Sequence, residues 1–404
     1  MPSLRFLSRM SKELPQYTVF FFSTLFFIPV VFADNPPEIH EKGRLYRIND
    51  YPVLVLEGTY KEMGRQYGKL LKDEILGMNN TILEVYFTKY ESPETAIAKA
   101  DGLMKYLFER LPKRFRDIFE GMAENCGLST ERLMLIDLVY ALDALGPGLE
   151  PQETCSSIAC WGEYTGGHPL ILGRNFDYPV HYRQFSPFLC VIVLNPSDGS
   201  VPTATLGYAG HVGTLHFFNR EGLAMEMNDG RQIGGRDAVD HYDRLPFSIL
   251  VLRFGLDCEN LDQIDASLRT TRIAHPFLAN VVDMKTAYTY EMGTRDMVRR
   301  GDVHEGLQVV CNTPIDPYWT NVSPTETSKK RRENLLTLAG KYKGTIDLEC
   351  MKRIMEVPYE QGGATVPTTI YQFVYEPDKR TLHLRVPDFR DWTMIALGQF
   401  FISD

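Results

Sequence analysis

The sequence predicts an α+β fold in which helices cover antiparallel β-sheet. The chain has 404 residues, of which 44% are hydrophobic and 24% charged, so it has enough apolar material for one large domain or two moderate ones. Helical patterns dominate from about residue 59 to 145, and strand patterns with a period of two dominate after Cys155. A helical first third followed by strands that alternate with helices is typical of α+β layers.

The first 33 residues are predicted to be a secretory signal peptide. Three basic residues, Arg5, Arg9 and Lys12, precede an apolar run over 17–32, and the small residue Ala33 follows that run. An uncleaved anchor is the alternative, although the run is shorter than the ~20 residues of a spanning helix. In either case we expect the body of the chain to be exported to a periplasm, a lumen or the medium. We expect no stable membrane insertion once the signal is removed, because no later stretch is long and apolar enough.

Residues 34–154 are predicted to form a mainly helical segment. The polar, proline-containing residues 34–49 indicate a loose lead-in, and 51–57 have the composition of a strand. Thr59 followed by Glu62 has the order of a capping box and predicts a helix that continues to about Ile75. Further helix starts are indicated at Ser92-Pro93, at Pro112 and at Ser129-Thr130, and glycine and proline between 146 and 151 mark a loop that ends at Thr154.

Residues 155–404 are predicted to contain most of the β-structure, with helices between the strands. The expected strands are 188–194, 215–218, 223–227, 287–291 and 307–311, followed by a C-terminal hairpin of 365–375 and 381–386. The expected helices lie near 246–255, 260–270, 328–341 and 347–356.

Charge, cysteine count and the lack of common binding motifs limit the partners and cofactors that we expect. The net charge is −9 and the longest basic run is only Lys329–Arg332, which argues against nucleic acid. Seven cysteines are too few for a disulfide-built scaffold, and their odd number leaves at least one thiol unpaired unless it bonds another chain; Cys155 is our candidate. No common metal-binding or phosphate-binding motif occurs, so we expect neither a metal nor another cofactor.

Cys155 begins a segment that runs as a strand to 162 and returns at 169–178. A thiol acts as a nucleophile only as thiolate, which requires a base or a positive charge nearby. None of the nine histidines lies in a recognisable protease signature. A second route is cleavage of the Thr154–Cys155 bond, because the freed α-amino group, with a pKa of about 7.7 to 8.0, can serve as the base for its own side chain. The sequence around Cys155 favours this second route.

Two motifs carry a family resemblance. Cys155-Ser-Ser-Ile together with Gly173-Arg-Asn-Phe-Asp-Tyr-Pro179 resembles the N-terminal-nucleophile hydrolases of the choloylglycine hydrolase type. The similarity is strongest to the peptidase C45-like branch with isopenicillin N acyltransferase, acid ceramidase and N-acylethanolamine acid amidase, and residues 57–68 are similar to the propeptide opening of the acyltransferases. The resemblance covers most of residues 50–390, and within that range only short motifs are specific to the family. It implies a four-layer αββα sandwich of antiparallel sheets, with 34–154 as the propeptide segment and 155–404 as the catalytic segment.

The resemblance also implies how the nucleophile is generated and assisted. Cys155 falls on the family's nucleophile, and the autocleavage site lies between Thr154 and Cys155. Arg174 and Asp177 fall on the family's arginine and aspartate three residues apart. Asp177 would hold the freed α-amine, and Arg174 would stabilise negative charge near the thiolate.

Three further residues match the family's later positions. Asn228 matches the residue whose backbone N–H helps to form the oxyanion hole, and Asn312 matches the asparagine whose side-chain amide supplies the other donor. Arg331 matches the final arginine. A donor aimed at the developing alkoxide lowers the barrier by about 3 kcal/mol, whereas a donor that binds the substrate equally well adds little to the rate.

Each of these residues also has a structural interpretation. The alternatives are a buried thiol or a disulfide with Cys160 for Cys155, an ion pair beside a turn for Arg174 and Asp177, a turn cap for Asn228, a strand end for Asn312 and a solvated helix start for Arg331.

The predicted function is that of an autoprocessed amidohydrolase that forms an acyl-thioester on Cys155. The resemblance implies a small-molecule substrate, a linear N-acyl amide with an apolar acyl group. Tyr178, Tyr182, Phe185 and Phe188 suit either an acyl pocket or the protein core. Two other functions remain open: acyl transfer to an amine acceptor, and a non-catalytic binding protein with this fold.

Overall fold

The computed structural model describes residues 35–140, 155–233, 244–301, 305–320, 322 and 324–402. The predicted signal peptide (1–33) and Thr154 lie outside the described residues.

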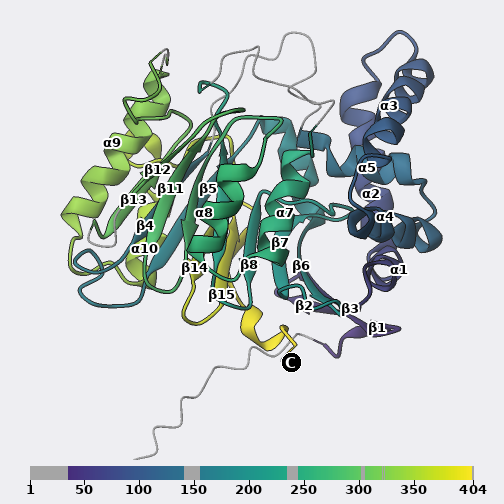
Figure 1. Cartoon of the computed structure of the whole chain (residues 1–404), viewed down its shortest axis with the longest axis horizontal. Helices are drawn as coiled ribbons and strands as arrows, with labels where there is room; N and C mark the ends of the chain where they lie inside the picture. Colours follow the sequence, from purple (N-terminus) through teal and green to yellow (C-terminus); the bar gives the residue numbers. More distant parts are fainter. Residues whose placement is uncertain are drawn as a thin grey trace, which may run out of the picture. The chain divides into compact units, whose positions relative to one another are not determined.

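The described strands form two sheets (Figure 1). Every strand pair is antiparallel except β3 and β6, which are parallel. The larger sheet contains, in order, β1 (Glu38–His40), β2 (Gly43–Ile48), β3 (Tyr51–Gly58), β6 (Leu189–Pro196), β7 (Thr203–Tyr208), β8 (His216–Asn219), β9 (Ala224–Asp229), β10 (Phe277–Val282), β11 (Ala287–Met292) and β12 (Met297–Arg300). The smaller sheet contains β13 (Leu307–Val310), β4 (Ser156–Cys160), β5 (Ile171–Asp177), β14 (Thr369–Glu376), β15 (Thr381–Val386) and β16 (Arg390–Ala396).

The two sheets pack face to face between two layers of helices. Aromatic side chains join the inner faces, as where the ring centroids of Phe218 and Tyr375 lie 4.6 Å apart. Helix α7 (Phe247–Asp257) packs on β7–β9 of the larger sheet, and α8 (Leu261–Thr270) meets the same sheet through Asp265 and Tyr290. Helices α9 (Glu326–Lys341) and α10 (Leu348–Glu356) cover the smaller sheet. The predicted α+β class and its αββα layering are therefore confirmed.

Helices follow one another along the described part of the N-terminal segment, where the sequence predicts them. They are α1 (Tyr60–Leu70), α2 (Lys72–Ile82), α3 (Pro93–Phe108), α4 (Lys113–Cys126) and α5 (Thr130–Asp137), with a π-helical turn η1 (Leu83–Phe87) after α2. The predicted capping box is present: the Thr59 side chain accepts from the Glu62 N–H, and the Glu62 carboxylate accepts from the Thr59 N–H at 2.8 Å. Helix α1 packs on α4 and on β3.

The prediction of a loose lead-in over 34–49 is wrong. Residues 38–40 and 43–48 form the hairpin of β1 and β2, which extends the larger sheet beyond β3. Its turn contains Glu41 with φ of 52°, a left-handed conformation that the polar composition did not reveal. The sequence prediction also omits β7, β10, β12 and β16. In β7 and β10 all six residues are buried, so the alternation that indicates a half-exposed strand is missing.

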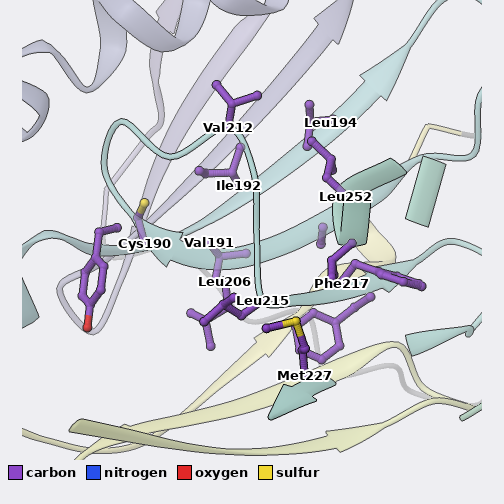
Figure 2. Packing of buried hydrophobic residues seen from close by; sticks show 14 of the residues in the cluster. Cys190, Val191, Ile192, Leu194, Leu206, Val212, Leu215, Phe217, Met227 and Leu252 are labelled. Atoms are coloured by element: carbon purple, nitrogen blue, oxygen red, sulfur yellow. The ribbon is translucent and has the colours of Figure 1, made fainter. Parts of the chain in front are cut away.

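The main apolar cluster runs from the N-terminal helices through β6–β9 and α7 to the inner face of the smaller sheet, and a second cluster lies between that sheet and α9 and α10. Figure 2 shows part of the main cluster, with Cys190 and Ile192 of β6, Phe217 of β8 and Leu252 of α7 labelled. All seven cysteines are buried and unpaired, so the alternative disulfide between Cys155 and Cys160 is not formed. Among the described helices, none is long and apolar enough to cross a membrane.

Candidate active site

Cys155 lies directly before β4, with 5% of its surface exposed. Its Sγ donates a hydrogen bond to the main-chain oxygen of Asp177 at 3.6 Å. Its main-chain N–H donates to Oδ1 of Asn312 at 3.0 Å, and its main-chain oxygen accepts from Nη1 of Arg331 at 2.7 Å. The structure therefore brings three of the predicted site residues into direct contact with Cys155.

Sheet register explains how residues far apart in the sequence meet here. Strand β4 lies between β13 and β5, where Ser157 pairs with Val310 on one side and with Arg174 on the other. Asn312, two residues after Val310, and Asp177, at the end of β5, therefore reach the same end of the sheet as Cys155. Pairing of the three strands is therefore what brings these residues to one end of the sheet.

Helix α9 supplies the third partner. The Thr325 side chain caps its N-terminus by accepting from the Ser328 N–H at 3.3 Å, and the Ser328 hydroxyl accepts from the Asn312 N–H at 3.2 Å. Arg331 is 1% exposed and faces the sheet, with Nη2 donating to Oδ1 of Asn312 at 3.2 Å. Arg331 is thus a buried site group, and the solvated alternative is wrong.

The carboxyl group of Asp177 is fully buried. Its Oδ1 accepts from the Thr369 hydroxyl at 2.5 Å, and its Oδ2 lies 3.5 Å from Nη1 of Arg331. Burial raises the pKa of Asp177 to about 7, although Arg331, Thr369 and Arg174 each oppose that rise. The carboxyl group can therefore gain or lose a proton near neutral pH.

Arg174 belongs to a second, adjoining cluster. Its guanidinium forms an ion pair with Glu226, and it donates to Oδ1 of Asn228 at 2.8 Å and to the main-chain oxygen of Met227 at 2.5 Å. Arg174 pairs with Glu226 and Asp177 with Arg331, so the two motif residues do not pair with each other. The hydrogen bonds of Arg174 go to β9 rather than to the thiol of Cys155.

The side chains of both predicted oxyanion residues are hydrogen-bonded within the protein in this structure. The side-chain amide of Asn228 donates to both carboxylate oxygens of Glu226, at 3.2 and 3.1 Å. The amide of Asn312 donates to the main-chain oxygen of Asp229 at 3.2 Å. Asn312 must exchange this acceptor for an oxyanion before it can play its predicted role.

The surroundings of Cys155 hold its thiol in the protonated form in this structure. Burial raises its pKa, which the positive charges of Arg174 and Arg331 lower and the charge of Asp177 raises further. Because the nitrogen of Cys155 is still an amide that donates to Asn312, it offers no lone pair as a base. The thiol therefore lies among the matched residues in its protonated form.

Sequence reasoning missed Glu226 and Thr369. Glu226 is fully buried in β9, and Thr369 begins β14 opposite Asp177. A glutamate in the middle of the apolar strand Ala224–Asp229 is a signal that could have identified the first. Thr369 carries no such signal, because only the register of β14 on β5 places it at the site.

The aromatic residues after the motif pack into the protein. The hydroxyl of Tyr178 donates to the main-chain oxygen of Tyr140 at 2.8 Å, and that of Tyr182 donates to Val139 at 2.9 Å. The ring of Phe176 stacks on Tyr371 with centroids 4.5 Å apart. In this structure Tyr182 and Phe185 belong to the buried apolar cluster, and the half-buried Tyr178 and Phe188 pack against it. No group of three or more metal-ligating side chains occurs among the described residues.

Comparisons with known proteins cover most of the candidate site residues. The sequence profile of the family described as acyl-coenzyme A:6-aminopenicillanic acid acyl-transferase matches residues 164–391, more than half of the chain. The match includes Arg174, Asp177, Asn228, Asn312 and Arg331 and begins after Cys155. A search among curated proteins finds no match.

Several solved structures are similar at low sequence identity. An N-acylethanolamine-hydrolyzing acid amidase ortholog from Caenorhabditis elegans is 14% identical, with a TM-score of 0.43 over 60% of this chain and 100% of that one. Penicillin V acylase from Agrobacterium tumefaciens is 13% identical, with a TM-score of 0.44 over 61% and 87%. A mutant conjugated bile acid hydrolase from Clostridium perfringens is 12% identical, with a TM-score of 0.46 over 61% and 93%.

Proposed function

Because the chain belongs to the acyl-coenzyme A:6-aminopenicillanic acid acyl-transferase family, we propose that it is an autoprocessed amidohydrolase of linear N-acyl amides that works through Cys155. One observation carries the proposal. Cys155 contacts Asp177, Asn312 and Arg331 at once, and these three buried residues come from β5, the end of β13 and α9. Any buried main-chain N–H and C=O needs a partner, but a purely structural thiol has no need for the buried side chains of Asp177, Asn312 and Arg331 to converge around it.

Autocleavage is the first proposed reaction. The Sγ of Cys155 attacks the carbonyl carbon of Thr154, the bond to the nitrogen of Cys155 breaks, and that nitrogen takes up the proton that the thiol loses. Water then hydrolyses the resulting thioester, which leaves a carboxylate on Thr154 and restores the thiol. The hydrogen bond from the Cys155 N–H to Asn312 supports this step, because it fixes the nitrogen of the peptide unit that must react. Arg331 fixes the following peptide unit through the carbonyl oxygen of Cys155.

Turnover repeats the chemistry on an external amide. The new α-amine takes the proton of the Cys155 thiol, the thiolate attacks the substrate carbonyl, and the amine product leaves with that proton. Water then hydrolyses the acyl-thioester. We assign oxyanion donation to the backbone N–H of Asn228 and the amide of Asn312, each worth about 3 kcal/mol of barrier. To Asp177, whose pKa burial raises to about 7, we assign a hydrogen bond from the α-amine.

Acyl transfer is the second candidate, and the description of the matched family favours it. Both reactions share the acyl-thioester and differ in whether water or an amine resolves it. The two are separated by measuring free acid against new amide when an N-acyl amide and an amine acceptor are supplied together. We expect free acid to be the main product. A new amide as the main product would show that the protein is an acyltransferase and not a hydrolase.

Export is part of the proposal. The basic and apolar order of residues 1–33 supports a cleaved signal peptide. N-terminal sequencing of protein from the native host is expected to begin at Asp34. A sequence that begins upstream, with the apolar run retained, would contradict export by signal removal.

The proposed activity is tested with a panel of N-acyl amides that differ in acyl length. Wild-type protein is expected to release free acid, and C155A is expected to release none. Cys160→Ala is the matched control, because Cys160 is equally buried in the same strand but faces α10. C160A is expected to keep activity. Hydrolysis by C155A at the wild-type rate would rule out the mechanism.

A further inference from the structure

Glu226 occupies the middle of β9 and is completely buried. Its carboxylate accepts hydrogen bonds from the hydroxyl of Ser157, the guanidinium of Arg174 and the side-chain amide of Asn228. It also accepts from the main-chain N–H of Asn280 at 3.1 Å. Four donors on one carboxylate satisfy a charge that burial alone would make very costly.

The cluster around Glu226 joins the two sheets. Asn280 in β10 donates through Nδ2 to the hydroxyl of Ser157 in β4 at 2.9 Å. Thr289 in β11 then donates to Oδ1 of Asn280 at 2.8 Å or to Oε1 of Gln308 in β13 at 2.9 Å. Glu226 is thus the anionic centre of a polar layer inside an otherwise apolar interface.

Strand register places this centre close to the nucleophile. Ser157 pairs directly with Arg174, and Cys155 lies two residues before Ser157 on the same face. Arg174 is therefore the diagonal neighbour of Cys155, and Glu226 is bonded to both Ser157 and Arg174.

We propose that Glu226 is a positioning residue for Cys155. Glu226 holds Arg174 between the two sheets and neutralises the charge of Arg174 beside the thiol. The inference rests on the proposed function, in which Cys155 is the nucleophile. Glu226 acts through Arg174 and has no hydrogen bond to Cys155 itself among the described contacts.

The charges around Cys155 define the expected effect. The titratable groups that act on it are Arg174 and Asp177 from β5, Arg331 from α9, Cys311 after β13 and Tyr371 from β14. Arg331 is matched by Asp177, and Arg174 is matched by Glu226. Removing the charge of Glu226 alone therefore leaves one unmatched cation near the thiol, which favours thiolate.

The test is the pH dependence of alkylation of Cys155 by iodoacetamide, followed on the peptide that contains it by mass spectrometry. In Glu226→Gln we expect the midpoint to fall by about one pH unit relative to wild type. Glu291→Gln is the matched control, because Glu291 is equally buried in β11 and paired with Arg300. E291Q is expected to keep the wild-type midpoint. An unchanged midpoint in E226Q, or an equal shift in E291Q, would overturn the inference.

A second pair of variants keeps the test decisive if E226Q does not fold. In Arg174→Gln the charge of Glu226 is unmatched, so the midpoint is expected to rise by about one unit, and R174Q/E226Q is expected to return towards wild type. Equal midpoints in R174Q and the double variant would also overturn the inference. Alkylation of Cys155 does not require turnover. An inactive wild type would therefore contradict the proposed function, while the alkylation midpoints would still test the role of Glu226.

Discussion

At the scale of single residues, the site depends on groups that are each held by several partners. Asn312 is the clearest example, because its amide bridges the nitrogen of Cys155 and the oxygen of Asp229 while Arg331 contacts the same Oδ1. These contacts hold Asn312 in one orientation, and its proposed oxyanion role requires the amide to leave the oxygen of Asp229.

Replacing Asn312 with alanine removes one proposed oxyanion donor. We expect kcat for amide hydrolysis to fall by about 10²–10³ while KM changes little, because the donor acts mainly in the transition state. Steady-state kinetics on the best amide of the panel measure this. Asn260→Ala is the control: Asn260 caps α8 far along the chain, and its loss is expected to lower stability by about 1 kcal/mol without changing kcat. An unaltered kcat in N312A would remove Asn312 from the mechanism.

The six proposed site residues could be selected from the sequence because they lie in short motifs. The structure brings Cys155, Asp177, Asn312 and Arg331 together and puts Arg174 and Asn228 in the adjoining cluster. Glu226 and Thr369 could not be assigned in this way. Their partners lie on other strands, and only the register of β9, β5 and β14 creates the contacts.

At the scale of elements, glycine sets how closely α1 and α4 approach. A Cβ on Gly68 would lie 2.3 Å from the main-chain oxygen of Met122, and one on Gly64 would lie 2.2 Å from that of Ile118. These oxygens belong to a helix backbone and cannot rotate away. The helix pair therefore depends on small residues at this contact.

Gly68→Ala is expected to lower the free energy of unfolding by about 1–3 kcal/mol, because the helices must move apart. Gly102→Ala in α3 is the matched control, since a Cβ there meets nothing within 4 Å. G102A is expected to raise stability by about 1 kcal/mol through helix propensity. Urea unfolding of both variants tests this, and a G68A protein as stable as G102A would show that the close contact is not needed.

Asp137, at the end of α5, ties the helical segment to the larger sheet. Its Oδ1 accepts from the N–H groups of Val212 and Gly213 at 2.8 and 2.6 Å, and its Oδ2 accepts from the hydroxyl of Ser248 at 3.3 Å. Burial raises the pKa of Asp137 to about 6, against the effect of these donors. The folded state therefore binds this proton more tightly than the unfolded chain does.

The raised pKa of Asp137 has a defined effect on stability. Its contribution favours folding below the ordinary pKa near 4 and is lost as pH rises to about 6, because the folded state must then ionise a buried group. Wild type is expected to lose up to about 3 kcal/mol more than Asp137→Asn between pH 4 and 7. Urea unfolding at both pH values measures the difference, with Asp117→Asn as the control, because Asp117 is half-buried and paired with Lys113 at the surface. Parallel losses in wild type and D137N would contradict the raised pKa.

The elements themselves were partly predictable. Capped helices with a polar face, such as α1, were expected from the sequence, whereas strands buried on both faces, such as β10, lack the alternation on which strand prediction depends. The hairpin of β1 and β2 was missed because its residues are polar, and its pairing with β3 is a tertiary contact.

At the scale of the whole molecule, the order of helical and strand regions was enough to predict the α+β class, and the family resemblance implied its αββα layering. The family profile confirms the resemblance that short motifs around Arg174, Asn228 and Asn312 carried. Substrate identity could not be read in the same way, because aromatic residues behind the motif that would suit an acyl pocket pack within the apolar cluster or against it. The division of the chain at Cys155 stays a prediction.

The most direct test of the account is the intact mass of purified, matured protein. We predict two chains that separate under denaturing conditions, the second beginning with Cys155 and ending at Asp404. C155A, folded as judged by an unchanged circular dichroism spectrum, is predicted to remain one chain. A wild-type protein that hydrolyses amides while the Thr154–Cys155 bond stays intact would contradict the central claim, as would cleavage of C155A at the same bond.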